Sequence, residues 1–331
     1  MTPRERVLAA LHRERLAPVP VGAVTQSATL DQMRAAAAYW PEAHREAEQM
    51  AALAYVPCVL LGFETVRVPF DQTIEAELFG ASVALGDETA IGSVRSHPFR
   101  LDQPLPPLPD FATGRARVVT EAIGILKRHV GEAAAVIGGL VGPFTLVCQL
   151  AGLAEVVTAA LRRPETVRPW LEPAVEAGIV YARRQVEAGA DAICIEDMSA
   201  SLDLTSPGIY RDLILPAHQR LIGAIDAPVI LHMCGGNTRI LDLLCQSGAD
   251  ALSLEAKTDL ARAVSLGTCA VASGVDPVAT LLNGTAEDVR WACLRDLEAG
   301  VHILAPGCGL APATPWDNLQ EMVRAAHEHT A

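Results

Sequence analysis

The sequence has few aromatic residues and fewer basic residues than acidic ones. Aromatic side chains make up only 4% of its 331 residues, although half of the residues are hydrophobic. Alanine, valine, leucine and isoleucine must therefore fill the core, as the packed strands and helices of an α/β protein require. The formal net charge of −13 means that the chain lacks the basic surface that binds nucleic-acid backbones, so we expect no nucleic-acid partner.

The sequence also lacks recognisable targeting and membrane-spanning segments. Its first residues, MTPRERVLAALHRERLAP, are too polar for a signal peptide. They predict a short amphipathic helix that is capped by Thr2, begins at Pro3 and ends before Pro18. No run reaches the roughly 18 uninterrupted apolar residues of a membrane span. We therefore expect a cytoplasmic protein with no membrane partner.

The eight cysteines are scattered over the chain, so a disulfide framework is not expected. A free cysteine inside an apolar run behaves as a small core residue. Four cysteines lie in such runs and are interpreted in this way: Cys58, Cys148, Cys194 and Cys269.

Short apolar runs alternate with longer amphipathic segments over most of the chain. The runs predict eight strands, at residues 19–24, 56–61, 135–139, 192–196, 228–232, 251–254, 269–273 and 301–305. The segments between them, such as 164–187, 207–224 and 285–299, are long enough for crossover helices. Eight strands separated by helices predict an α/β fold, the (β/α)8 TIM barrel. An open doubly wound sheet is the alternative, but no G-x-G-x-x-G motif follows the first strand.

One stretch departs from this alternation. Residues 75–95 alternate apolar and polar side chains around glycine turns, which predicts a small antiparallel β insertion after the second strand. The next segment, LDQPLPPLPDF, contains too much proline for a helix or a central strand and predicts a stiff connector. We therefore expect one barrel domain over residues 1–331, with residues 75–110 forming the inserted hairpin and the connector.

Candidate metal ligands follow the predicted strands. His232 and Cys234, in VILHMCGG, are two residues apart and would project to one side of a strand, and Cys308 follows the last strand in PGCG. Each of them alone fits a packing or turn residue. Because the carboxyl ends of barrel strands converge, the three together predict a catalytic Zn²⁺ site with an open position. Glu255 is a candidate fourth ligand, although a solvated glutamate that pairs with Lys257 fits equally well.

This donor set narrows the chemistry. Two thiolates neutralise the charge of Zn²⁺, and a substrate thiol that binds at the open position loses its proton and becomes a nucleophile. Hydrolytic zinc sites more often use imidazole and carboxylate ligands, which leave the metal a stronger Lewis acid. The donor set therefore favours alkylation of sulfur, such as methyl transfer, over hydrolysis.

At these positions the sequence resembles the uroporphyrinogen decarboxylase superfamily, and within it the branch of methylcobamide:coenzyme M methyltransferases. The resemblance covers nearly the whole chain and rests on MTPRERVLAAL, PVGAVTQSATL, PEAHREAEQMAALA, LGFETVRVPF, GPFTL, VILHMCGGNT, SGVDPVATLLNGT and PGCGLAPATPWDNL. It implies a barrel that binds one zinc through His232, Cys234 and Cys308. It also implies the reaction, in which a methyl group moves from a methylcobamide on a partner corrinoid protein to the thiol of coenzyme M.

Three further residues are candidates for substrate binding. The backbone at Asn237 and Thr238 is expected to open a helix and is a candidate anion site. Asp276 could line the pocket or cap the helix expected to begin at Pro277, and we favour the cap. Ser273 stands where the resemblance leads us to expect asparagine.

Three other functions stay open. A lyase that decarboxylates a tetrapyrrole would need basic residues for the substrate carboxylates, and the founding family's arginine-rich motif is missing from PVGAVTQSATL. A corrinoid-dependent demethylase, or a methyltransferase with another donor or acceptor such as homocysteine, would use the same zinc site. A binding module with a structural zinc is disfavoured, because a barrel of this size has core enough to fold without metal.

Overall fold

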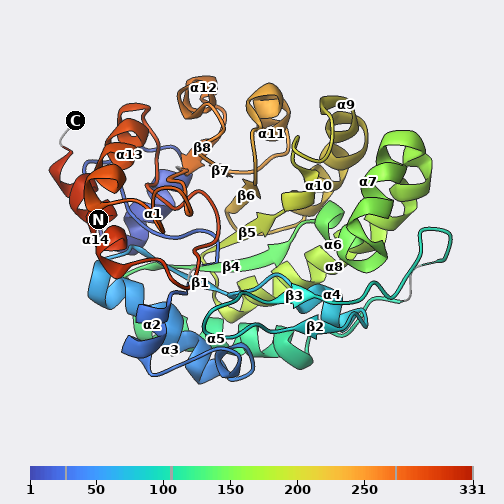
Figure 1. Cartoon of the computed structure of the whole chain (residues 1–331), viewed down its shortest axis with the longest axis horizontal. Coiled ribbons are helices and arrows are strands. Elements are labelled where there is room, and N and C mark those ends of the chain that lie inside the picture. The colour runs from blue at the N-terminus through green and yellow to red at the C-terminus, as the bar shows by residue number, and fades with distance from the viewer. Residues whose placement is uncertain (27, 105–106, 273, 330–331) are drawn as a thin grey trace.

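The computed structural model describes residues 1–26, 28–104, 107–272 and 274–329. At its centre lies a parallel sheet of six strands in the order β1–β4–β5–β6–β7–β8, with helices around it (Figure 1). These strands are β1 (Thr65–Val68), β4 (Ala135–Val141), β5 (Ala192–Glu196), β6 (Val229–Met233), β7 (Ala251–Leu254) and β8 (Ala270–Ala272).

Two extended segments close this sheet into a barrel. Ile303 pairs in parallel with Ala272 of β8, and the next residue, Leu304, pairs in parallel with Val21. The carbonyl of Val21 in turn accepts a hydrogen bond from the backbone N–H of Glu64, directly before β1. The eight parallel segments therefore form a closed ring. The predicted TIM barrel is confirmed, and the open doubly wound sheet is wrong.

The strand predicted at residues 56–61 is also wrong. Helix α3 (Ala47–Val56) continues into a π-helical turn, η2 (Pro57–Leu61), and β1 takes the place of the second barrel strand. A short apolar run fits the buried end of a helix as well as it fits a strand. The other predicted strands coincide with β4–β8 and the two closing segments, except that Ser273, the expected end of one strand, lies outside the described residues.

The barrel interior is built mainly from small side chains. Its inward-facing cluster consists largely of alanine, which explains how the fold forms with so few aromatic residues: Ala135, Ala192, Ala251, Ala270, Ala272 and Ala305, together with larger residues such as Ile137, Ile230 and Ile303. Helix α1 (Pro3–Leu11) packs Val7 and Leu11 against this cluster. The predicted cap of α1 is confirmed, because Thr2 and Glu5 form a capping box.

Helices cover the outside of the barrel. The predicted crossover helices are confirmed as α8 (Pro164–Ala188), the continuous α9 (Pro207–Ile209), η4 (Tyr210–Ile214) and α10 (Leu215–Ile222), and α13 (Ala286–Glu298). The others are α2 (Leu30–Ala36), η1 (Glu42–His44), α5 (Gly114–Val130), α6 (Pro143–Ala151), α7 (Leu153–Arg162), η3 (Met198–Ala200), η5 (Thr238–Ile240), α11 (Leu241–Cys245), α12 (Leu260–Leu266) and α14 (Trp316–Glu328). By length and composition, no single described helix could cross a membrane, and α6 and α7 pass that test only as a pair bent by 117°.

The predicted antiparallel insertion follows β1. Strands β2 (Val83–Ala84) and β3 (Ser93–Val94) pair antiparallel, which confirms it. The first part of the predicted hairpin is instead the short helix α4 (Ile74–Leu78). There Glu75 is buried, and its carboxylate accepts a hydrogen bond of 2.8 Å from the backbone N–H of Val141 at the end of β4. The insertion is thus tied to the end of a barrel strand.

Candidate metal centre

Three neighbouring strands present polar side chains at the same level of the barrel. Glu196 ends β5, and the strand register pairs it with His232 of β6, which in turn pairs with Ser253 of β7. All three side chains are fully buried. Partners in a parallel register share a face of the sheet, and this face is the barrel interior because Cys194 and Ile230, two residues earlier, belong to the inward cluster. The row lies at the carboxyl ends of the strands, where barrel enzymes place their chemistry.

The predicted ligands come together beside this row. His232 Nε2 lies 3.3 Å from Cys234 Sγ, and Cys234 Sγ lies 3.7 Å from Cys308 Sγ. The ligand atoms of the three residues all lie within 4.8 Å of one another. Zinc bonds of about 2.3 Å to sulfur and 2.0–2.1 Å to nitrogen, set at tetrahedral angles, separate two sulfurs by about 3.8 Å and a sulfur from a nitrogen by about 3.5 Å. The cluster therefore has the dimensions of a tetrahedral zinc site.

The buried imidazole of His232 is oriented by its neighbour in the register. Its Nδ1 lies 3.0 Å from the hydroxyl oxygen of Ser253, so its Nε2 faces the cysteines. Hydrogen on Nδ1, donated to the serine, leaves the lone pair of Nε2 free for a metal. Ser253 was not among the predicted site residues, because a serine inside the run ALSL gives no signal of its own.

The two thiols of the cluster differ in acidity. A hydrogen bond from Cys234, aided by one from His232, lowers the pKa of Cys308 to about 4 although burial opposes the shift. The same hydrogen bond to Cys308, together with burial, raises the pKa of Cys234. The cluster thus stabilises a thiolate at Cys308, and a thiolate is the form of cysteine that binds metal.

The loop after β6 is shaped to present Cys234. Gly235 has a φ of +78°, and a Cβ there would lie 2.5 Å from Ser201 Oγ, so only glycine fits without strain. The buried side-chain amide of Asn237 donates to the carbonyl of Cys234 at 2.6 Å. Its backbone N–H donates to Thr258 Oγ1 at 3.0 Å. These two hydrogen bonds tie Asn237 to the loop that carries Cys234, and the candidate anion site at the backbone of Asn237 and Thr238 stays a prediction.

The remaining predicted residues have different surroundings. Thr238 begins η5, and its hydroxyl accepts a hydrogen bond from the backbone N–H of Asp259. Asp276 accepts hydrogen bonds from the backbone N–H groups of residues 278 and 279, as the favoured capping role predicts. The segment that it caps is a run of turns, however, and not the expected helix. Glu255 is half-buried, and its charge acts on both His232 and Cys234, but it is not one of the three clustered ligands. The alternative partner named for Glu255, Lys257, has its Nζ 3.8 Å from Oδ2 of Asp203.

A buried ion pair borders the cluster and was missed by the sequence reasoning. Arg67 of β1 reaches across β4 to Glu196, and Gln72 donates to the other carboxylate oxygen. The guanidinium can cross because β4 has Gly139 at this level, where a Cβ would collide with it. Burial raises the pKa of Glu196 despite the nearby Arg67 and His232. The one signal for Glu196 was its place at the end of the apolar run AICIE.

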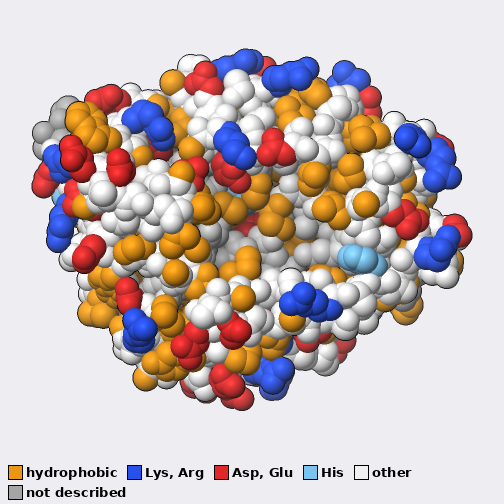
Figure 2. Space-filling view, in the orientation of Figure 1, with side chains coloured by type: hydrophobic (Ala, Val, Ile, Leu, Met, Phe, Trp, Pro, Cys, Tyr) orange, Lys and Arg blue, Asp and Glu red, His pale blue; other side chains and the backbone are white. Residues whose placement is uncertain are grey.

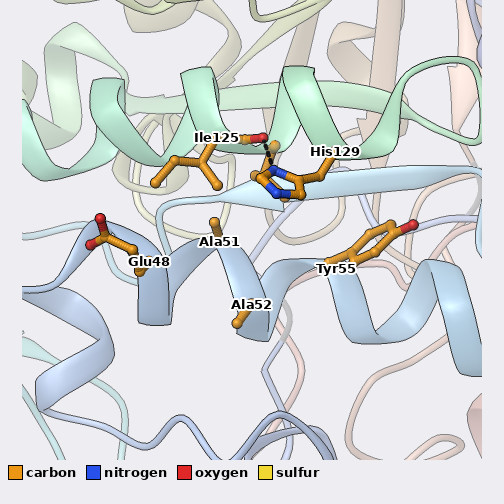
Figure 3. A pocket seen from close by; sticks show the side chains of 7 residues that line it. Glu48, Ala51, Ala52, Tyr55, Ile125 and His129 are labelled. Atoms are coloured by element: carbon orange, nitrogen blue, oxygen red, sulfur yellow. Dashed lines mark hydrogen bonds between the residues drawn. The ribbon is translucent and has the colours of Figure 1, made fainter.

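The surface is hollowed both over the barrel strands and outside the barrel. Figure 1 places β4, β5 and β6 in the middle of the view, and Figure 2 shows that this face is hollowed there, with hydrophobic and uncharged side chains around most of the rim. A second hollow lies between α3 and α5, outside the barrel (Figure 3). It is lined by Glu48, Ala51, Ala52, Tyr55, Ile125, Leu126 and His129. Its lining comes from helices and is largely apolar, so we do not assign it to the metal centre.

Comparison with known proteins gives matches over the whole chain. The family model for uroporphyrinogen decarboxylase (URO-D) matches residues 2–329. The methylcobamide:CoM methyltransferase MtbA of Methanosarcina acetivorans is 37% identical over 99% of this chain and 98% of the relative. The methylcobamide:CoM methyltransferase MtaA of Methanosarcina barkeri is 34% identical over 100% and 99%. The solved structure of a methyltransferase from Methanosarcina mazei has a TM-score of 0.93 at 35% identity and covers 99% of both chains.

Proposed function

This chain belongs to the uroporphyrinogen decarboxylase family, and we propose that it is a zinc-dependent methyltransferase. In this proposal, the methyl donor is a methylated corrinoid on a partner corrinoid protein, and the acceptor is a small thiol. Coenzyme M is the first candidate acceptor, because the relatives that match the full chain are named methylcobamide:CoM methyltransferases.

The observation that carries the proposal is the donor set at the barrel mouth. Two cysteine sulfurs and one imidazole nitrogen lie at separations that fit tetrahedral zinc, and three protein ligands leave one position for a substrate. When bound, zinc would depress the pKa of an acceptor thiol and hold it as a thiolate at neutral pH.

The chain's own residues then have distinct tasks. His232, Cys234 and Cys308 would hold the metal, and Ser253 fixes the orientation of the imidazole. Asn237 holds the loop that carries Cys234. The acceptor sulfur forms a bond to the methyl carbon while the methyl–cobalt bond breaks and its electron pair stays on cobalt. The protein's contribution is to activate and position the nucleophile.

The fourth ligand in the absence of substrate is part of the same proposal. Glu255 follows β7, and its charge acts on His232 and Cys234. A carboxylate at this place would occupy the open position until the thiol displaces it. Replacement by glutamine would keep the side-chain volume and remove the charge. It should therefore leave zinc bound and change the affinity for the acceptor thiol.

The tetrapyrrole decarboxylase is the weaker alternative. It would need free cationic side chains for several substrate carboxylates, and the segment PVGAVTQSATL offers none. Arg67, which does lie beside the cluster, is already paired with Glu196. Arg67 is thus not free to bind a substrate carboxylate.

Zinc content and thiol-dependent demethylation of methylcobalamin test the proposal together. The purified protein should contain one zinc per chain, and coenzyme M should cause loss of the methyl–cobalt absorbance spectrum. Cys308→Ala should remove both. Cys293→Ala, a buried cysteine of α13 outside the cluster, is the matched control and should keep both.

The outcome also separates the alternatives. A protein without zinc, or a Cys308→Ala variant that keeps zinc and activity, would overturn the ligand assignment. Faster demethylation with homocysteine than with coenzyme M would change the acceptor. Methylation of reduced cobalamin by a methylated thiol, with no demethylation of methylcobalamin by coenzyme M, would favour a demethylase. Turnover of uroporphyrinogen would favour the decarboxylase.

A further inference from the structure

A second pair of cysteines lies at the other end of the barrel. Cys245 is the last residue of α11, and Cys269 directly precedes β8. Their sulfur atoms lie 3.0 Å apart. Cys269 lies at the amino end of its strand, whereas Cys234 and Cys308 follow the carboxyl ends of theirs. The two thiol pairs are therefore separate sites.

The pair is more exposed to solvent at Cys245 than at Cys269, although Cys269 also lines a hollow, beside Arg15 and His302. Cys245 is half-buried and lines a surface hollow with Arg13, Asp250 and Thr268. Cys269 is only 2% exposed. A reagent in the hollow therefore meets the sulfur of Cys245 first.

The two thiols also differ in reactivity. Hydrogen bonds from Cys269 and from Thr268 lower the pKa of Cys245 to about 7, although burial opposes this shift. The bond to Cys245 and burial raise the pKa of Cys269. The accessible thiol is thus also the one that ionises near neutral pH, and a thiolate is the attacking species in thiol–disulfide exchange.

We propose that Cys245 and Cys269 are a redox site that forms a reversible intramolecular disulfide with small disulfides as the oxidant. The Cys245 thiolate attacks one sulfur of the oxidant RSSR, which gives a mixed disulfide and releases one RS⁻. Cys269 then loses its proton and attacks Cys245 Sγ, which forms the internal bond and releases the second thiolate. Two cysteine thiols are oxidised, RSSR is reduced to two RSH, and excess RSH reverses both steps.

The geometry favours the second step over a lasting adduct. The two sulfurs need to approach by only about 1 Å to reach the disulfide bond length of about 2.05 Å. The new bond would join the end of α11 to the start of β8 and enclose β7 in its loop. It would not consume a proposed zinc ligand.

The test uses the whole 331-residue chain, loaded with zinc, and glutathione disulfide as the probe. After incubation, free thiols are alkylated and the protein is digested for mass spectrometry. We expect a cross-linked peptide that joins Cys245 to Cys269, restored to two thiols by reduced glutathione, and unchanged zinc content. Cys58, a half-buried cysteine hydrogen-bonded to the carbonyl of Ala133, has no thiol partner among the described residues and should give at most a glutathionyl adduct.

Two variants separate the roles of the two sulfurs. In Cys269→Ser, the glutathionyl adduct on Cys245 should persist, because no thiol resolves it. In Cys245→Ser, Cys269 should stay unmodified. Cys58→Ser is the control and should form the cross-link between Cys245 and Cys269 at the wild-type rate. The proposal is overturned if Cys245 and Cys269 remain free under conditions that modify Cys58. It is also overturned if Cys269→Ser accumulates no adduct on Cys245.

Discussion

Removal of the Ser253 hydroxyl isolates one hydrogen bond of the proposed zinc site. Ser253→Ala deletes a single oxygen atom, 3.0 Å from His232 Nδ1, and leaves all three predicted ligands in place. The variant should bind zinc about 10–100 times more weakly than the wild type, the usual cost of losing the partner that orients a ligating histidine. This corresponds to about 1.4–2.7 kcal/mol of binding free energy.

The surroundings of Ser253 support this magnitude. The serine is fully buried, and its register neighbour on β8 is Ala272, which offers no hydrogen-bonding side chain. In the alanine variant, Nδ1 of His232 would therefore lose a partner in a dry environment. An unpaired buried polar group costs about 1–3 kcal/mol, which agrees with the expected loss in affinity.

Competition against a chelator of known zinc affinity measures the effect. Ser247→Ala is the matched control, because Ser247 is also buried but donates to the carbonyl of Leu244, outside the metal cluster. The control should bind zinc as the wild type does. Wild-type affinity in Ser253→Ala would refute the reasoning, since it would mean that the imidazole does not depend on this serine for its orientation. Equal losses in both variants would show a general effect on folding.

Two more predictions concern stability. Burial raises the pKa of Glu75 to about 7, above its ordinary value of 4.5, so the wild type should lose up to about 3 kcal/mol of stability as the pH rises from 4.5 through 7. Glu75→Gln should abolish this dependence of stability on pH and be more stable than the wild type at pH 8. Thermal unfolding of both proteins across that pH range measures the effect, and parallel profiles of stability against pH would contradict the burial argument. Gly139→Ala should displace Arg67 from Glu196 and destabilise the protein by about 3–5 kcal/mol in denaturant unfolding. Gly124→Ala, where the new Cβ has room in helix α5, should show no such loss, and equal stability of the two variants would be the contrary result.

The barrel and its three central side chains could be predicted from the sequence because each left a local signal. Most strands are continuous apolar runs, as expected for strands covered on both faces. His232 and Cys234 directly end one such run, and Cys308 follows another between glycines. The second barrel strand was predicted at the wrong place, because the true strand is not a continuous apolar run. Arg67 interrupts TVRV, so the stronger apolar run at 56–61 predicts the strand instead, and that run is helical.

The groups that contact the candidate ligands left no such signal, because they are defined by strand register and not by motif. Ser253 and Glu196 flank His232 in space but lie 21 and 36 residues from it in sequence. Neither belongs to a spacing pattern that would mark a partner of a ligand. Once the strand register is known, however, it predicts that Glu196, His232 and Ser253 lie side by side, because paired residues of parallel strands project to the same face of the sheet. The three candidate zinc ligands are therefore marked locally in the sequence, whereas the orientation of His232 depends on how three strands align, and Ser253→Ala tests that dependence directly.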